Sequence, residues 1–274
     1  AKYQDYILGK SDERLPLWIK PDKKISLKEL KNLMRDHFEG TPLAIDSGVG
    51  SEPFGASYRY APREWEVDGT KYFNENPIAG PHNAFSFIAQ MRSWLPNMVG
   101  GVLWYGVDDA TFTVYIPIYI ATTDVPECFR KGNGSLLEFS WTSAYWVFNW
   151  VANLTYSRYE YMSKDVLKIQ DELERKFEDN LEVVEEAAKS LYTKSPDFAA
   201  RFLTEYSQNQ SYITMERWKK LGEFLMVKYC DGNIKRERGG VFIDNGWGVP
   251  AGISSPGYSD WFYKQIIETT GDKY

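Results

Sequence analysis

The chain has 274 residues and carries 32 lysine and arginine against 38 aspartate and glutamate side chains, a formal net charge of −6. A chain of this length can bury a large core, in one domain or two. The acidic balance, which no basic cluster interrupts, argues against a nucleic-acid surface, and no apolar run reaches the roughly 20 residues of a membrane helix.

The cysteines and histidines give little support for a disulfide or a metal site. Cys128 and Cys230 are the only cysteines and lie far apart, so free structural thiols are favoured over a pair. His37 and His82 are the only histidines, and no His/Cys pair has the spacing of zinc ligands. The chain begins with Ala1 and shows no signal-peptide pattern there. We therefore expect a mature product or part of a longer protein.

The first predicted helix follows an irregular segment. Prolines and charges predict loops over residues 1–25. Ser26 then begins a capping box, with Glu29 at the third helical position, and apolar residues recur at helical spacing over residues 27–38. We expect a helix there that ends before a glycine, with His37 in its last turn, where the helix dipole favours a cation.

A short hairpin is predicted in the turn-rich region 41–84. Glycine and proline are frequent in this region, and strand patterns are few. Asp68–Gly69 is a strong two-residue hairpin signal. It lies between residues that predict two paired strands within 65–72.

A three-stranded meander is predicted next. Residues 85–91 alternate between apolar and polar, residues 99–107 are nearly all apolar, and alternation returns over 112–119. A Leu-Pro-Asn sequence and the Asp108–Asp109 pair supply the turns. Such short connections make the three strands neighbours in an antiparallel sheet. One face of this sheet should meet helices, and the other should meet something equally apolar.

Helical periodicity dominates from residue 141 onward. The first helix is aromatic on most of its sides, which is typical of a buried helix, and the next carries one apolar stripe among many charges. Ser195 followed by proline is a strong helix start. The predicted helices cover residues 141–162, 164–192, 196 to about 207, about 212 to 229, and 259–269.

The order of elements, strands first and helices afterwards, predicts an α+β fold with helices on one face of an antiparallel sheet. We interpret residues 1–274 as a single domain or half-domain. Its parts are a loop-rich segment and meander (1–120), a helical layer (121–232), and an irregular tail with a short helix (233–274).

Several separate motifs together resemble the family C69 dipeptidases. They are MRDHFEGTP (residues 34–42), FSFIAQMRSWLP (85–96), GGVLWYGVDD (100–109) and WTSAYWVFNWVANLTYSRYEYM (141–162). The resemblance extends in order over roughly residues 10–230. These dipeptidases are cysteine peptidases of the N-terminal-nucleophile hydrolase class, related in fold to bile-salt and penicillin amidases.

The resemblance implies an αββα sandwich, of which this chain would supply one antiparallel sheet and its helices. It also implies hydrolysis of small peptides without a metal or organic cofactor. In that class a free N-terminal cysteine is the nucleophile, its α-amine is the base, and amide groups stabilise the oxyanion.

The nucleophile should lie in an N-terminal half that precedes this chain. Ala1 has no nucleophilic side chain, and Cys128 stands where the family pattern places no nucleophile. The expected partners are therefore that N-terminal half and a small peptide substrate. A bare sheet face should also lead the chain to associate with itself.

The resemblance places substrate-facing groups just before the strand at residue 85. The candidates are Asn76, His82 and Asn83, where the family tends to have an arginine near the first and threonine or glutamine near the others. It also tends to have an aromatic residue and an aspartate where this chain has Leu43 and Ala44. His82 and Asn83 either line the pocket, polarising a carbonyl or binding a carboxylate, or hold a turn.

Two further pocket candidates belong to the meander. Asp108 and its neighbour Asp109 either act on substrate or cap the turn, and adjacent residues of a strand point in opposite directions. Arg92 either anchors a substrate carboxylate or forms a salt bridge at the strand end. Asn149 and Asn153 lie one turn apart in the aromatic helix and are expected to be buried, satisfied amides.

Two functions are compatible with these observations. The first is the C-terminal portion of a cysteine dipeptidase, which by itself would be inactive. The alternative is a catalytically inactive homologue that binds peptides or glycans, suggested by the altered residues before the meander and by the many aromatic side chains. Hydrolysis that depends on an upstream cysteine would distinguish the first from the second.

Overall fold

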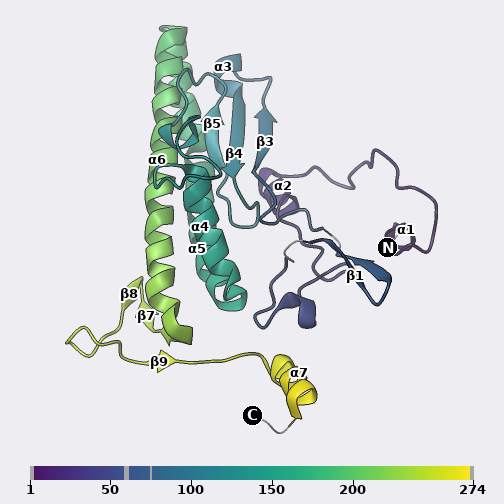
Figure 1. Ribbon diagram of the computed structural model, residues 1–274. Helices are drawn as coiled ribbons and strands as arrows, with labels where there is room; N and C mark the ends of the chain where they lie inside the picture. The colour runs from purple at the N-terminus through teal and green to yellow at the C-terminus, as the bar shows by residue number, and fades with distance from the viewer. Residues whose placement is uncertain (1–2, 59–61, 75, 272–274) are drawn as a thin grey trace.

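Two helices of 34 residues each, α5 (Tyr159–Tyr192) and α6 (Pro196–Tyr229), run side by side along the length of the molecule (Figure 1). The computed structural model describes residues 3–58, 62–74 and 76–271. The shorter helices are α1 (Gln4–Ile7), α2 (Leu27–Leu33), α3 (Asn97–Gly100), α4 (Ala144–Tyr156) and α7 (Asp260–Thr270). None of the helices in the described ranges is long and apolar enough to cross a membrane.

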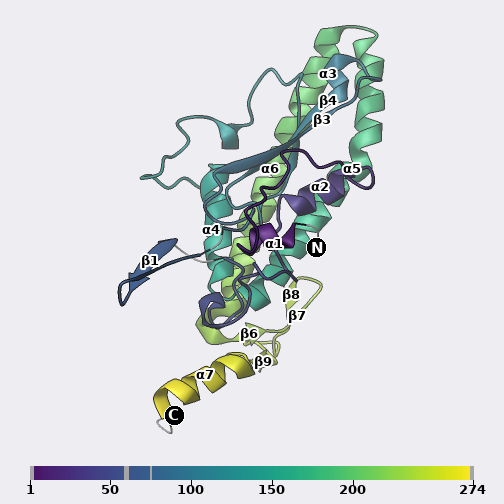
Figure 2. The same ribbon diagram turned by 90° about the vertical axis from the view of Figure 1, so that its right-hand side faces the viewer.

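The strands form small antiparallel sheets. They are β1 (Glu64–Val67), β2 (Thr70–Phe73), β3 (Phe85–Met91), β4 (Gly101–Val107), β5 (Ile116–Tyr119), β6 (Ile234–Lys235), β7 (Glu237–Arg238), β8 (Val241–Phe242) and β9 (Ile253–Ser254). The result is a mixed α+β structure, as predicted. The β1–β2 hairpin is confirmed, with Asp68 and Gly69 both at positive φ, and it projects from the body of the molecule (Figure 2).

The predicted meander is confirmed, with the strand order β3-β4-β5. Phe85 pairs with Val107 at one end of the β3–β4 ladder, and Met91 pairs with Gly101 at the other. Two of the predicted bounds are wrong. The second strand begins after the helical turn α3 rather than at Val99, and the third begins at Ile116 rather than at residue 112.

Side chains of α5 explain why residues 112–115 are not part of the third strand. Gln170 Nε2 donates to the carbonyls of Thr111 at 3.0 Å and Thr113 at 2.7 Å, and Glu174 Oε1 accepts from the amide of Tyr115 at 2.8 Å. The helix therefore satisfies backbone groups that a strand partner would otherwise take.

One face of the meander is covered by helices, as expected. On that face Ile88, Val102 and Trp104 are buried, and β5 lies against α6 (Figure 1). The indole of Trp104 donates to Gln90 Oε1 at 3.0 Å. The ammonium group of Lys31 on α2 lies 4.3 Å from the centre of the Trp104 ring. The core thus lies between the sheet and the helical layer.

The opposite face of β3 is open in the described structure. Phe85, Phe87 and Met91 are 56%, 50% and 62% exposed. On β4 the same face is partly covered, because the ring of Phe129 lies edge-on to Tyr105 at 5.2 Å. The face of β3 that is apolar in the alternating sequence pattern therefore has no covering layer in the described structure.

The first predicted helix ends earlier than its apolar spacing indicated. The capping box of Ser26 and Glu29 is confirmed, but α2 ends at Leu33 and Phe38 has a φ of 65°. His37 is consequently not in a last helical turn, and the prediction for it is wrong. It is buried beyond the helix, and its Nε2 lies 2.8 Å from Thr111 Oγ1.

The boundaries of α4 and α5 also differ from the prediction. The helices are separated at Ser157 and Arg158 rather than at Ser163, and Arg158 leaves the helical region with φ −148° and ψ 56°. Its guanidinium donates to the carbonyl oxygens of Gly232 at 2.9 Å and of Tyr229 and Asn233 at 3.3 Å. The break between the two helices thus supplies a cap for the end of α6.

A single helix, α6, replaces the two that were predicted over residues 196–229. The start is as expected, because Ser195 caps it and Pro196 is its first residue. The polar residues near the predicted break do not interrupt it. Ser211 Oγ donates to the carbonyl of Ser207 at 2.8 Å, and Thr214 Oγ1 to that of Gln210 at 2.8 Å, so these hydroxyls are satisfied within the helix.

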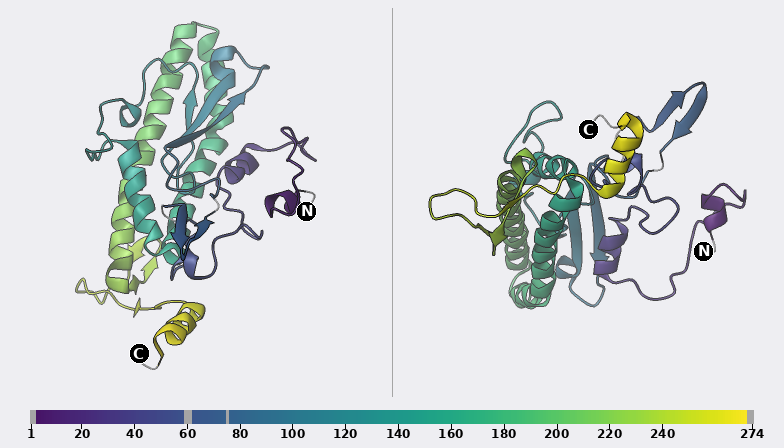
Figure 3. Two further views of the ribbon diagram at one scale, coloured as in Figure 1. Left: turned by 45° about the vertical axis from the view of Figure 1, so that its right-hand side comes forward. Right: turned by 90° about the horizontal axis from the view of Figure 1, so that it is seen from below.

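The tail after α6 contains two small strand pairs and a closing helix. β6 pairs with β9, and β7 pairs with β8. The predicted closing helix is confirmed as α7, with Ser259 at its N-cap position, and it lies beyond the end of the long helices (Figure 3). The ring of Tyr258 contacts that of Phe54 at 5.5 Å.

Candidate functional site

Four of the five predicted pocket residues belong to one end of the meander. Because β3 and β4 are antiparallel, the start of β3 lies beside the end of β4, and the amide of Asp108 donates to the carbonyl of Ala84 at 2.9 Å. Asn76, His82 and Asn83 precede β3, and Asp108 follows β4. The fold therefore brings two sequence-distant groups of candidates to the same sheet end.

The segment before β3 is a set of interlocked turns. Asn83 Oδ1 accepts from the amide of Gly80 at 2.9 Å, and Asn76 Nδ2 lies 3.3 Å from His82 Nε2. Gly80 is required by packing, because a Cβ there would lie 2.8 Å from the ring of Tyr58. Asn83 thus has the turn role considered from sequence.

His82 combines an accessible ring edge with a packed ring face. Its imidazole stacks on Tyr58 with centroids 5.8 Å apart and an interplanar angle of 22°. Partial burial lowers the pKa of His82, and the nearby Arg63 cation lowers it further. The imidazole is therefore neutral at pH 7 and keeps one nitrogen as an acceptor.

Asp108 is almost fully buried, with 1% of its surface exposed. Its Oδ1 accepts from Asn149 Nδ2 on α4 at 2.9 Å, while Oδ2 has no hydrogen-bond partner among the described residues. Burial raises the pKa of Asp108 to about 7. Asp108 is thus a carboxyl group that changes its charge near neutrality.

Asp109 is tied to the same helix by a different bond. Its Oδ2 accepts from the hydroxyl of Tyr156 at 2.7 Å, and its Oδ1 accepts from the amide of Thr111 at 2.9 Å. Burial raises the pKa of Asp109 as well. The bond to Thr111 is the turn-capping role considered from sequence, and both adjacent carboxyl groups are held by α4.

Arg92 lies at the other end of β3, away from the four other candidates. Its guanidinium forms a buried ion pair with Glu185 of α5. It also donates to the carbonyls of Gly100 at 3.2 Å and Val99 at 3.3 Å. This is the salt-bridge alternative considered from sequence, and it holds the β3–β4 connection against the helical layer.

The two asparagines of α4 have different environments. Asn149 is half-buried and donates to Asp108. Asn153 is exposed and donates to the carbonyl of Asn149 at 2.9 Å. The prediction of two buried amides is therefore wrong for Asn153, which lies on the outer side of the helix.

A buried charge cluster between α2 and α5 was missed from the sequence. Arg35 binds Glu174 through both terminal nitrogens, at 3.2 and 2.5 Å. Lys31, with 1% exposure, lies 2.8 Å from Glu178 and 3.6 Å from Glu174. The charges of α5 resembled a solvated face, so the four-residue spacing of Lys31, on α2, and Arg35, just after its end, was the only available signal.

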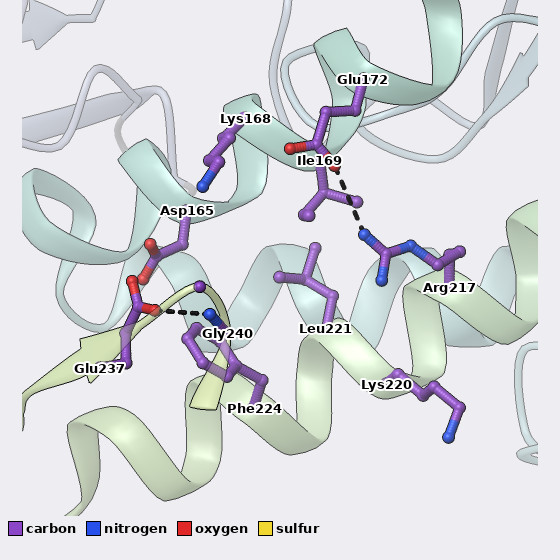
Figure 4. A pocket seen from close by; sticks show the side chains of 11 residues that line it. Asp165, Lys168, Ile169, Glu172, Arg217, Lys220, Leu221, Phe224, Glu237 and Gly240 are labelled. Carbon is purple, nitrogen blue, oxygen red and sulfur yellow. Dashed lines mark hydrogen bonds and ion pairs between the residues drawn. The ribbon is translucent and has the colours of Figure 1, made fainter. Parts of the chain in front are cut away.

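The cavity shown in Figure 4 does not contain any of the predicted site residues. It has a volume of about 460 Å³ and lies between α5, α6 and the β7–β8 hairpin. Ile169, Leu221 and Phe224 form an apolar floor, and Arg217 pairs with Glu172 at its side, 3.4 Å away. Within the described ranges, no group of His, Cys, Asp and Glu side chains could hold a metal ion.

Comparisons with known proteins agree with the motifs of the meander and α4. The profile of Peptidase family C69 matches residues 2–172. The match covers more than half of the chain, which therefore belongs to Peptidase family C69. Helix α6 and the tail lie outside the matched region.

Two curated relatives are described as probable dipeptidases. The chain is 28% identical over 149 residues to a probable dipeptidase B of Lactococcus lactis subsp. lactis (strain IL1403), covering 54% of this chain and 27% of that protein. It is 25% identical over 148 residues to a probable dipeptidase of Latilactobacillus sakei, covering 53% and 26%. The matched part of the chain thus spans about a quarter of each relative.

Proposed function

We propose that the chain is the C-terminal portion of a C69 cysteine dipeptidase, and that its nucleophile is a cysteine in a preceding segment. Family membership and the two dipeptidase relatives support the reaction class. The short coverage of those relatives supports an additional segment. Ala1 lies outside the described residues, and Cys128 is half-buried in a loop that faces α6.

The open face of β3 is the observation that carries the structural part of the proposal. Phe85, Phe87 and Met91 alternate along one strand and are exposed together, whereas the opposite face of the same strand is packed. An apolar sheet face normally packs against a second layer. We assign that layer to the N-terminal half of the protein, which would complete an αββα sandwich.

The sheet end with Asn76, His82, Asn83 and Asp108 is the proposed wall of the substrate pocket. Asn76 offers its amide oxygen and its second amide hydrogen to a small peptide, while its first amide hydrogen and the acceptor nitrogen of a neutral His82 contact each other. Asp108 and Asn149 hold the β4 end against α4. Arg92 has a structural role in this proposal, because its guanidinium is already engaged by Glu185 and two carbonyls.

In the proposed reaction the cysteine sulfur attacks the peptide carbonyl while the α-amine of the same residue accepts the thiol proton. Amide groups stabilise the tetrahedral oxyanion. The proton then passes to the leaving amine, and water hydrolyses the thioester in the same way. The part of the protein described in this structure contributes walls and positioning rather than the attacking atom.

The test is hydrolysis of a dipeptide panel by the full-length protein and by its variant with the upstream cysteine changed to alanine. Turnover by the first and its loss in the second are expected. His82→Ala and Asn76→Ala should raise KM more than they lower kcat, whereas Arg130→Ala, in the exposed loop before α4, should change neither. Turnover that is unaffected by loss of the cysteine would disprove the mechanism.

One observation favours the alternative of a binding module. Trp65 and Tyr72 stack on the projecting hairpin, with centroids 5.9 Å apart and an interplanar angle of 20°. They line a groove of about 530 Å³ together with other hairpin residues. Stacked aromatic faces also suit sugar rings and peptide side chains. Saturable glycan or peptide binding that Trp65→Ala abolishes, without any turnover, would support this function instead.

A further inference from the structure

A cysteine and a lysine outside the family match lie in direct contact at the end of α6. Lys235 Nζ is 2.9 Å from Cys230 Sγ. The same ammonium group donates to the carbonyl of Val227 at 2.5 Å, in the last turn of α6. Both side chains are partly accessible to solvent.

The backbone on either side holds the two residues at this distance. Between them the chain turns sharply, with Asp231 at a φ of 57° and Gly232 at 76°. Arg158 of the α4–α5 break fixes the turn by donating to the carbonyl of Gly232 at 2.9 Å. From the other side, Lys235 is paired with Ile253 in the β6–β9 ladder. β6 and β9 lie at the C-terminal end of α6 (Figure 2), so the contact is part of the folded arrangement of α6 and the tail.

We propose that Cys230 and Lys235 form an oxidative cross-link, a sulfenamide bond between Sγ and Nζ, when the protein meets a peroxide. A lysine nitrogen next to a thiol sulfur can trap the first oxidation product of that sulfur before further oxygen is added. The bridge would join the C-terminal end of α6 to β6 covalently.

The chemistry takes place in two balanced steps. The thiol sulfur attacks the peroxide, its S–H and the O–O bond break, an S–O bond forms, and one water leaves. After the Lys235 ammonium has given one proton to solvent, its nitrogen attacks the sulfenic sulfur. An S–N bond forms, the S–O bond breaks, and the hydroxyl leaves with an amine proton as a second water. Sulfur is oxidised, the peroxide is reduced, and the chain loses two hydrogens in total.

The second cysteine is unsuited to the first step. Burial raises the pKa of the Cys128 thiol to about 12, so the thiol stays protonated near neutrality, and the thiolate is the reactive form. We therefore expect peroxide to modify Cys230 before Cys128.

The test uses the 274-residue chain with Cys128→Ser, which removes any disulfide within one chain. After brief exposure to hydrogen peroxide the intact mass should fall by about 2 Da. Digestion should yield joined peptides that contain Cys230 and Lys235 and that separate on reduction. In the parent chain, the joined peptides are distinguished by sequence from a Cys128–Cys230 disulfide, so the result does not depend on the background variant.

Two lysine variants provide the comparison. Lys235→Arg keeps the positive charge but should abolish the joined peptides and leave Cys230 to oxidise further. Lys228→Arg, whose lysine is in the last turn of α6 and is paired with Asp165 at 2.8 Å, should leave the cross-link unchanged. Amide hydrogen exchange over residues 234–254 should slow on oxidation in the parent and not in Lys235→Arg.

Three results would overturn the proposal. One is the same loss of mass in Lys235→Arg, which would assign the bond to a backbone nitrogen. Another is sulfinic or sulfonic acid at Cys230 without any joined peptides in the parent. The third is a joined product that is heavier by one oxygen, which would replace the S–N bond with a bridge through oxygen.

Discussion

Asp108 is deeply buried, and among the described residues one side chain, that of Asn149, donates a hydrogen bond to it. Its pKa is raised by burial to about 7, well above the ordinary value for aspartate. At a pH between the ordinary aspartate pKa of 3.8 and this raised pKa, the folded chain holds a proton that the unfolded chain has released. The free energy of unfolding should consequently fall as pH rises from about 4 to about 7. Burial raises the pKa of Asp109 too, so only a variant can separate the two contributions.

Asp108→Asn should remove the part of this pH dependence that Asp108 causes. The amide oxygen can still accept from Asn149, and asparagine tolerates the φ of 63° at this position. Urea denaturation at several pH values should show that the free energy of unfolding of the parent falls relative to that of the variant. The difference should grow by a few kcal/mol between about pH 4 and 7. Parallel stability curves for the two proteins would contradict a raised pKa.

Tyr156 satisfies a carboxylate that has little access to water. Its hydroxyl donates to Asp109 at 2.7 Å, and its ring packs against Phe112. Tyr156→Phe keeps the packing but removes a donor to a buried acceptor, so we expect a loss of about 1–3 kcal/mol in the free energy of unfolding. Tyr212→Phe is the matched control, because Tyr212 is 65% exposed on α6, and it should change stability by less than about 0.5 kcal/mol.

At the scale of elements, the contact between α4 and α6 depends on one glycine. Gly222 lies in the C-terminal half of α6, and a Cβ there would come 2.2 Å from the indole ring of Trp150 on α4. An alanine in place of an unconstrained glycine within a helix stabilises it by about 0.5–1 kcal/mol. Because Trp150 is so close, the same substitution at Gly222 should destabilise the protein instead.

Gly222→Ala should therefore destabilise the chain by about 1–3 kcal/mol, the usual cost of overpacking. Trp150→Leu should recover part of that loss in the double variant, because the smaller side chain leaves room for the added methyl group. A double-mutant cycle from thermal or chemical unfolding measures the coupling. Additive effects of the two changes would show that the helices move apart to accept the alanine.

At the scale of the whole molecule, local sequence patterns predicted helices and strands better than they predicted the partners of polar side chains. The capping box at Ser26 and the Asp68–Gly69 hairpin were predictable because each depends on neighbours in sequence. The continuity of α6 was not, since the same serines and threonines suit turns as well as helices. The role of Arg92 was not decided either, because its partner Glu185 is 93 residues away.

The open face of β3 gives the last prediction, which concerns association of whole chains. If Phe85, Phe87 and Met91 lack a covering layer, the isolated chain should bury them against another copy or aggregate. Changing all three to threonine keeps strand propensity and removes apolar surface. Sedimentation velocity should then show a shift toward monomer, and the variant should stay soluble at higher concentration.

Leu136 and Leu137 provide the control for that measurement. They are 77% and 99% exposed in the loop before α4, so changing both to serine removes a similar kind of surface and leaves the sequence of β3 intact. This variant should associate as the parent does. Adding the proposed N-terminal half should suppress self-association of the parent, because both partners would compete for one face. A parent chain that stays monomeric at all concentrations would show that its β3 face is already covered.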